Sequence, residues 1–68
     1  TTMSNPFMQY LVEDIQKELG DAQQFVYQKV EQPFGLCLIR AAEMAGLKAT
    51  AEWNAPAFRT MDVIIHQA

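Results

Sequence analysis

The sequence predicts a small, mainly helical α+β domain, in which a helical hairpin is followed by a C-terminal β-hairpin. Three observations lead to this fold class. An apolar stripe with helical spacing runs through the first half of the chain, and a proline followed by a glycine separates it from a second apolar segment. The last third then changes to an alternation of apolar and polar residues, which is typical of strands. We expect residues 1–68 to form a single small domain.

The first predicted element is one long helix over about residues 6–31. Ser4 or Asn5 can cap it, and Pro6 suits its first turn, where the missing N–H would be unpaired anyway. Apolar residues recur every three or four positions, which keeps one face of a helix dry. We expect this stripe to supply the core and a dimer interface; it consists of Met8, Val12, Ile15, Leu19, Ala22, Val26 and Val30.

The dipeptide Gly20-Asp21 leaves an alternative open. Gly20 could be the left-handed residue that closes a helix at Leu19, with Asp21 capping a second helix. The stripe stays in phase across this dipeptide, however, and a glycine inside a helix costs only about 1 kcal/mol relative to alanine. We therefore favour the continuous helix.

Pro33 predicts the end of the first helix, because its ring clashes with helical continuation. A second helix should follow over about residues 34–45 and end at Gly46. Only two charged residues interrupt its surface, so we expect it to be the most buried element, packed against the stripe. Its apolar positions include Leu36, Leu38, Ile39, Ala41, Ala42 and Met44.

The last third predicts a β-hairpin. Residues 47–53 alternate apolar and polar, residues 54–57 form a loop, and the segment from Phe58 to His66 contains a β-branched run. The apolar residues on one side of this second strand would be Met61, Val63 and Ile65. The alternative is a third helix opened by Asn54 and Pro56, which would give an all-α three-helix domain.

Composition narrows the class of protein. Half of the residues are apolar and 19% are charged, so the chain is globular. A single cysteine, Cys37, excludes an intrachain disulfide and suits a reducing compartment. No apolar run approaches the length of a membrane span, and the first residues do not resemble a signal peptide. We expect a cytoplasmic protein that does not bind membranes.

Nothing in the sequence predicts catalysis, a cofactor or a metal. His66 is the only histidine and lies near the C-terminus, and Cys37 sits among apolar residues, as a buried cysteine would. The adjacent Glu13 and Asp14 fall on the polar side of the first helix, opposite the stripe. We therefore expect a protein that is not an enzyme.

The sequence does not favour a nucleic-acid partner. The net charge is −3, and the five basic residues are spread along the chain instead of being clustered. Residues 41–47 resemble the turn of a helix-turn-helix, but a recognition helix after it would contain Glu52 and Pro56. A small DNA-binding regulator is the alternative to our main expectation.

Aromatic residues at the edges of the stripe predict a protein–protein interface, because one short helix cannot cover so broad a surface. We expect a homodimeric regulator or inhibitor that binds another protein, of the kind encoded by phages and mobile elements. A structural subunit of a larger assembly is a further alternative. The partner-binding residues we select are Tyr10, Tyr27, Trp53, Phe58 and Arg59.

Overall fold

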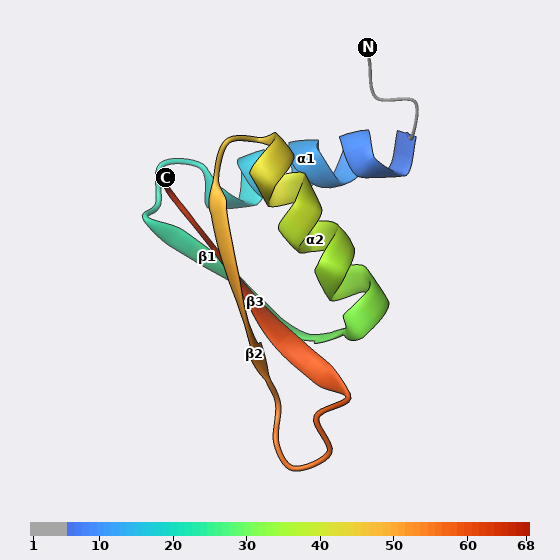
Figure 1. The fold of residues 1–68 in the computed structure, drawn as a ribbon. Coiled ribbons are helices and arrows are strands. Elements are labelled where there is room, and N and C mark those ends of the chain that lie inside the picture. The colour runs from blue at the N-terminus through green and yellow to red at the C-terminus, as the bar shows by residue number, and fades with distance from the viewer. Residues whose placement is uncertain (1–5) are drawn as a thin grey trace.

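A computed structural model describes residues 6–68, which form two helices and a three-stranded antiparallel sheet (Figure 1). The elements in chain order are α1 (Pro6–Leu19), β1 (Gln24–Glu31), α2 (Gln32–Met44), β2 (Lys48–Trp53) and β3 (Thr60–His66). The strand order is β1-β3-β2. The α+β class is therefore confirmed and the three-helix alternative is wrong. The predicted caps Ser4 and Asn5 lie outside the described residues.

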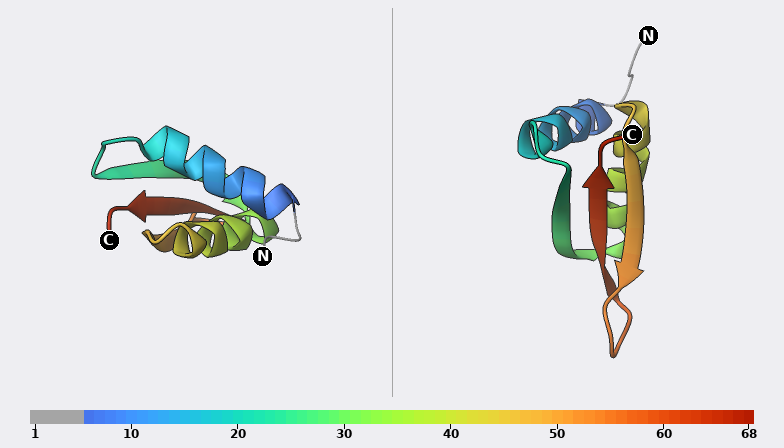
Figure 2. Two further views of the ribbon diagram at one scale, coloured as in Figure 1. Left: turned by 90° about the horizontal axis from the view of Figure 1, so that it is seen from above. Right: turned by 90° about the vertical axis from the view of Figure 1, so that its left-hand side faces the viewer.

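The helices cover one face of the sheet and leave the other face open. α2 packs along β3 and β2, whereas α1 lies across the end of the sheet near the start of β1 (Figure 2). The right-hand view of Figure 2 looks onto the open face, with α2 behind the strands. Both β1 and β2 are edge strands, and β2 lies at the outer border of the molecule.

The prediction of a continuous helix over residues 6–31 is wrong. α1 ends at Leu19, and Gly20 adopts a left-handed φ of +52° while its N–H donates to the carbonyl of Gln16 at 3.0 Å. This ending matches the alternative in which Gly20 closes a helix at Leu19. The residues beyond it form β1 instead of a second helix, because β-branched and aromatic side chains dominate the segment and favour a strand.

The helical phase of the stripe beyond Gly20 is a coincidence. Val26 lies opposite Ile64, on the open face of the sheet, whereas Tyr27 and Val30 lie opposite the buried Val63 and Met61. A β-bulge between Tyr27 and Val30 supplies the extra residue that lets both of them face the helices. Val26 and Val30 therefore point to opposite sides, and the predicted stripe continues only to Leu19.

Asp62 holds this bulge in place. Lys29, in the bulge, has a φ of +55°, and its N–H donates to Asp62 Oδ1 at 3.0 Å. The same oxygen accepts from Asn54 Nδ2 at 3.1 Å, and Asn54 Oδ1 accepts from the Thr60 hydroxyl at 2.7 Å. One carboxylate on the central strand thus ties the bulge of β1 to the far end of the β-hairpin.

α2 follows β1 without a loop. Pro33 lies in the first turn of the helix rather than separating two helices, because its fixed φ and missing N–H fit that turn. Gly46, with a φ of +78°, ends it as predicted: its N–H donates to the Glu43 carbonyl at 3.0 Å. The N–H of Leu47 donates to the Ala42 carbonyl at 2.9 Å, which completes a Schellman motif.

The predicted C-terminal hairpin is confirmed. β2 and β3 pair in an unbroken register from Lys48 opposite His66 to Trp53 opposite Met61. Met61, Val63 and Ile65 are buried on one side of β3, as the alternation predicts.

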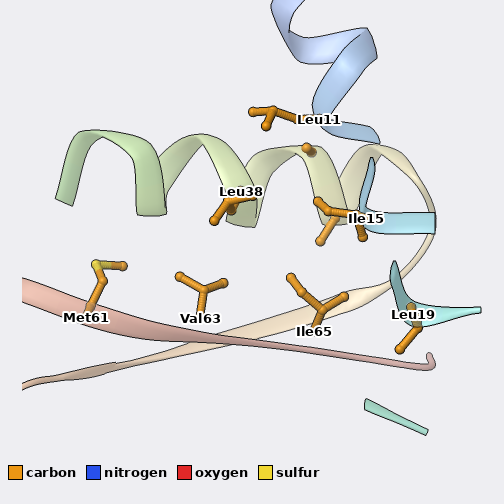
Figure 3. Packing of buried hydrophobic residues seen from close by; sticks show 9 residues of the cluster. Leu11, Ile15, Leu19, Leu38, Met61, Val63 and Ile65 are labelled. Carbon is orange, nitrogen blue, oxygen red and sulfur yellow. The ribbon is translucent and has the colours of Figure 1, made fainter. Parts of the chain in front are cut away.

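The core lies between β3, α2 and the inner side of α1 (Figure 3). Its buried residues are Leu11, Ile15, Leu19, Leu38, Ala41, Ala42, Met61, Val63 and Ile65. Met8 and Val12 of the predicted stripe pack at its margin. The expectation that α2 is the most buried element is wrong, since Leu36 is 54% exposed and Met44 is also exposed, whereas every residue of β3 is buried or half-buried.

Replacing Gly20 by alanine should lower the free energy of unfolding by about 1–2 kcal/mol, because the left-handed φ brings a Cβ too close to the following carbonyl. Urea denaturation of Gly20→Ala and the wild type measures this difference. An increase in stability would show that residues 6–31 form the continuous helix after all.

The two neighbouring leucines of α2 should respond very differently to truncation. Leu38→Ala should cost about 2–5 kcal/mol, since the side chain is fully buried over β3. At a concentration low enough for the chain to be monomeric, Leu36→Ala, on the exposed side of the same helix, should cost less than about 1 kcal/mol. Equal losses in thermal or urea unfolding would contradict the orientation of α2.

Candidate protein-binding surface

Large apolar side chains remain exposed on several elements of the described chain. They lie on both helices, at the end of β2 and in the loop between β2 and β3. These residues are Phe7, Tyr10, Phe34, Leu36, Met44, Trp53 and Phe58. Where such residues lie next to one another, they are candidates for contact with other molecules.

Three of the aromatic residues form what we call the aromatic cluster: Phe7, Tyr10 and Phe34. The rings of Phe7 and Phe34 approach with their centroids 6.4 Å apart and their planes at 45°, joining the first turns of α1 and α2. Tyr10 lies one turn after Phe7 on α1, so the two side chains are neighbours on the helix surface. Tyr10 is 63% exposed.

Trp53 lies on a different side of the molecule. It is opposite Met61, so both side chains share the helix-covered face of the sheet. Met61 in turn lies directly beneath Gly35, where an added Cβ would be only 2.8 Å from its Cε. Trp53 therefore lies beside the first turn of α2, and 45% of it is exposed because β2 is an edge strand of the sheet formed by residues 6–68.

Phe58 and Arg59 lie in the loop that connects β2 to β3. Phe58 has a φ of +58°, and its N–H donates to the Asn54 carbonyl at 2.9 Å. Both residues are exposed. This loop also contains the cis peptide bond between Ala55 and Pro56.

Tyr27 connects α1 to β1. It is half-buried, its ring lies edge-on against Phe25 with centroids 5.1 Å apart, and its hydroxyl donates to Asp14 Oδ2 at 2.8 Å. Burial, the hydrogen bond to Asp14 and the negative charge of Asp14 all raise the pKa of the hydroxyl above its ordinary value of 10.0. The bond fastens α1 to β1.

The selected binding residues therefore do not form one site. Tyr10 belongs to the aromatic cluster, Trp53 lies at the β2 edge, and Phe58 and Arg59 lie in the loop, while Tyr27 is half-buried and hydrogen-bonded to Asp14. Sequence reasoning overlooked Phe34 and Leu36 as surface residues because α2 is apolar over most of its circumference. The signal that could have revealed them is the small residues Gly35, Ala41 and Ala42, which mark the side that approaches the sheet.

The other reactive side chains have ordinary surroundings. Cys37 is a half-buried free thiol at the margin of the core, and His66 lies between Gln24 and Lys48 in the open-face register. Within residues 6–68, no group of three His, Cys, Asp or Glu side chains could hold a metal ion. Residues 48–53 form a strand, so the helix-turn-helix resemblance has no recognition helix.

Neither helix within residues 6–68 has the length and apolar character needed to cross a lipid bilayer. Comparison of the chain with known proteins gives no match to a protein family, a curated sequence or a solved structure. The surfaces described above therefore carry the functional argument on their own.

Tyr27→Phe should destabilise the protein by about 1 kcal/mol at neutral pH through loss of the bond to Asp14. Because folding raises the pKa of Tyr27, its contribution is present below pH 10 and is lost as the pH rises above that value. Wild-type stability should thus fall at alkaline pH more steeply than that of Tyr27→Phe. An unchanged alkaline slope in Tyr27→Phe would contradict the role assigned to the bond.

Proposed function

We propose that this chain is a non-enzymatic protein-interaction module, a homodimer that binds another protein through the aromatic cluster and modulates it. The observation that carries the proposal is the contact between Phe7 and Phe34, extended by the exposed Tyr10. Two helices each contribute an aromatic residue from their first turn, so the cluster rests on helical backbone.

Aromatic side chains on rigid elements are well suited to bind protein. Phenylalanine and tyrosine offer a large contact area with few rotatable bonds, and tyrosine adds a hydroxyl that can bind polar groups at the rim of an interface. Such residues commonly supply much of the binding energy at protein–protein contacts. The cluster therefore fits the apolar surface of a folded partner or an amphipathic helix.

The charge distribution favours protein over nucleic acid as the partner. The basic residues lie on separate elements, one on each helix, one on each of β1 and β2, and one in the loop before β3; they are Lys17, Lys29, Arg40, Lys48 and Arg59. A phosphate backbone needs cations gathered on one face. Arg40 and Glu43 share the exposed side of α2, which further lowers its attraction for a polyanion.

We place this activity in the cytoplasm, on the support of Cys37, which is a free thiol and the single cysteine of the chain. Modulation would follow from occlusion: a partner surface held against the aromatic cluster is unavailable to its other ligands. A regulator or inhibitor of this type needs no chemistry of its own.

Quantitative affinity capture from lysate of the source cell tests the proposal, with affinity then measured on the purified partner. Tyr10→Ala and Phe34→Ala should each weaken binding by about 1–2 kcal/mol, or about five- to thirty-fold, without changing the circular dichroism spectrum. Lys17→Ala, an exposed change on the same helix, is the matched control and should bind normally.

Trp53→Ala and Phe58→Ala show whether the other exposed aromatic residues contribute. Unchanged partner binding by both aromatic-cluster variants would overturn the assignment of the cluster. Tight binding to duplex DNA in a gel shift at low salt, lost at moderate salt, would support the DNA-binding regulator instead.

A further inference from the structure

We propose that β2 is the self-association edge of this protein, and that two copies pair antiparallel through it about a two-fold axis at Thr50. The result is a continuous six-stranded sheet with both α2 helices on one face. This inference rests on the homodimer of the proposed function and names the surface that forms it.

The two edges of the sheet differ in their readiness to pair. β1 carries the bulge with a left-handed Lys29, and a bulge twists an edge away from further pairing. β2 has neither a bulge nor a proline between Lys48 and Trp53, and its register with β3 is unbroken. β2 is thus the one of the two edges that is regular enough to receive another strand.

The direction of the free backbone groups follows from one hydrogen bond. The N–H of Asn54 donates to the Thr60 carbonyl at 2.9 Å, so Asn54 turns its backbone toward β3. Because these directions alternate along a strand, Thr50 does so as well, whereas Ala49 and Ala51 direct their N–H and C=O groups to the free edge. The backbone N–H and C=O groups of Trp53 also point to the free edge, as those of the two alanines do.

Only registers that pair outward-directed residues with each other can form a regular ladder. Pairing about Thr50 does so, because Ala49 then exchanges two hydrogen bonds with Ala51 of the second copy, and the symmetric pair does the same. It also places Lys48 opposite Glu52 of the second copy, twice by symmetry. Pairing about Ala49 or Ala51 is possible for the backbone but separates these charges.

The charge arrangement within one copy favours the same register. Glu52 lies directly opposite Asp62 on the open face, and like charges in this position repel. Lys48 of the second copy would lie on the other side of Glu52 and compensate this repulsion. Lysine on an edge strand normally opposes pairing, but here one register turns that charge into an attraction.

The helix-covered face of the same register is apolar. Small side chains of Ala49 and Ala51 meet across the junction, and Trp53 lies opposite Leu47 of the second copy, which covers its exposed ring. α2 lies over β3 and β2, so the two α2 helices would be separated by about two strand spacings, or about 10 Å, a usual distance for packed helices.

The flank of α2 that would meet its counterpart bears Leu36 and Ile39. Phe34 marks the other flank, where α2 contacts α1 through Phe7. Leu36 and Ile39, three residues apart, share the side away from that contact, and Leu36 is exposed in the single chain. The dimer thus accounts for two exposed apolar side chains, Leu36 and Trp53, that the aromatic cluster does not include.

Position-specific disulfide formation tests the register. In a Cys37→Ala background, Thr50→Cys should oxidise to a covalent dimer, because the paired Cα atoms at the two-fold axis lie about 4.5 Å apart. Ala49→Cys and Ala51→Cys are the matched controls. They should remain largely monomeric on non-reducing gels. In the proposed register each of these cysteines is about two residues along the strand from the same cysteine of the second copy, which is too far for a disulfide.

Charge reversal provides the second test. Lys48→Glu should raise the dimer dissociation constant at least tenfold in analytical ultracentrifugation, and the double variant Lys48→Glu with Glu52→Lys should restore it. Lys17→Glu makes the same charge change on α1 and should leave dimerisation unchanged. Failure of the double variant to restore the dimer would overturn the register.

Ala51→Pro covers the case in which a charge variant fails to fold. It removes an N–H that faces the free edge, so the pairing of β2 with β3 should survive while the dimer is lost. If the wild type is dimeric but the Thr50→Cys variant forms no disulfide, the assignment of the β2 edge is wrong and the proposed function still stands. A wild type that stays monomeric at high concentration would overturn both the edge and the homodimer, while partner binding is measured separately.

Discussion

The packing of β3 against α2 is the interaction on which the rest of this structure depends. β3 is the central strand, and its alternate side chains Met61, Val63 and Ile65 are almost completely buried beneath the helix. The other two strands gain their place by pairing with β3, and α1 completes the core at one end. A two-layer arrangement of this size has room for only one such core, so the position of every exposed residue follows from it.

The same packing decides which surfaces remain uncovered. Gly35, Ala41 and Ala42 let α2 approach the sheet closely, and that approach turns Leu36 to the opposite side of the helix. The helix lies over β3 and β2, and α1 covers the end near β1. Trp53 lies at the end of β2, whose outer edge is unpaired within residues 6–68, and its side chain therefore remains partly exposed to solvent. These exposures are consequences of close packing elsewhere.

Sequence reasoning succeeded where a local pattern and the tertiary structure agree. The alternation around Val63, the loop after Trp53 and the glycine ending at Gly46 each have a local cause, and each is found in the structure. It failed at residues 24–31, because their helical spacing is matched by a strand with a β-bulge. The bulge depends on Asp62, more than thirty residues away in the sequence, and no local pattern contains that information.

The candidate surfaces were only partly predictable for a related reason. Tyr10 and Trp53 could be selected as exposed aromatic residues, but Tyr27 could not be distinguished from them without its bond to Asp14. Phe34 gains its significance from its contact with Phe7, which requires the first turns of two separate helices to meet. The number of aromatic residues predicts that a binding surface exists. Which residues form that surface depends on contacts between elements that are distant in the sequence.

The two proposed surfaces lie on different flanks of α2, so each could be used without covering the other. Phe34 faces α1 on one flank, and the flank with Leu36 and Ile39 lies toward the β2 edge. Association through β2 would therefore leave the aromatic cluster of each copy uncovered, and a two-fold dimer would present two clusters. A protein that binds a partner with both clusters gains affinity from the linkage itself, without any additional contact in either site. Such pairing is a physical route from two modest aromatic surfaces to effective binding.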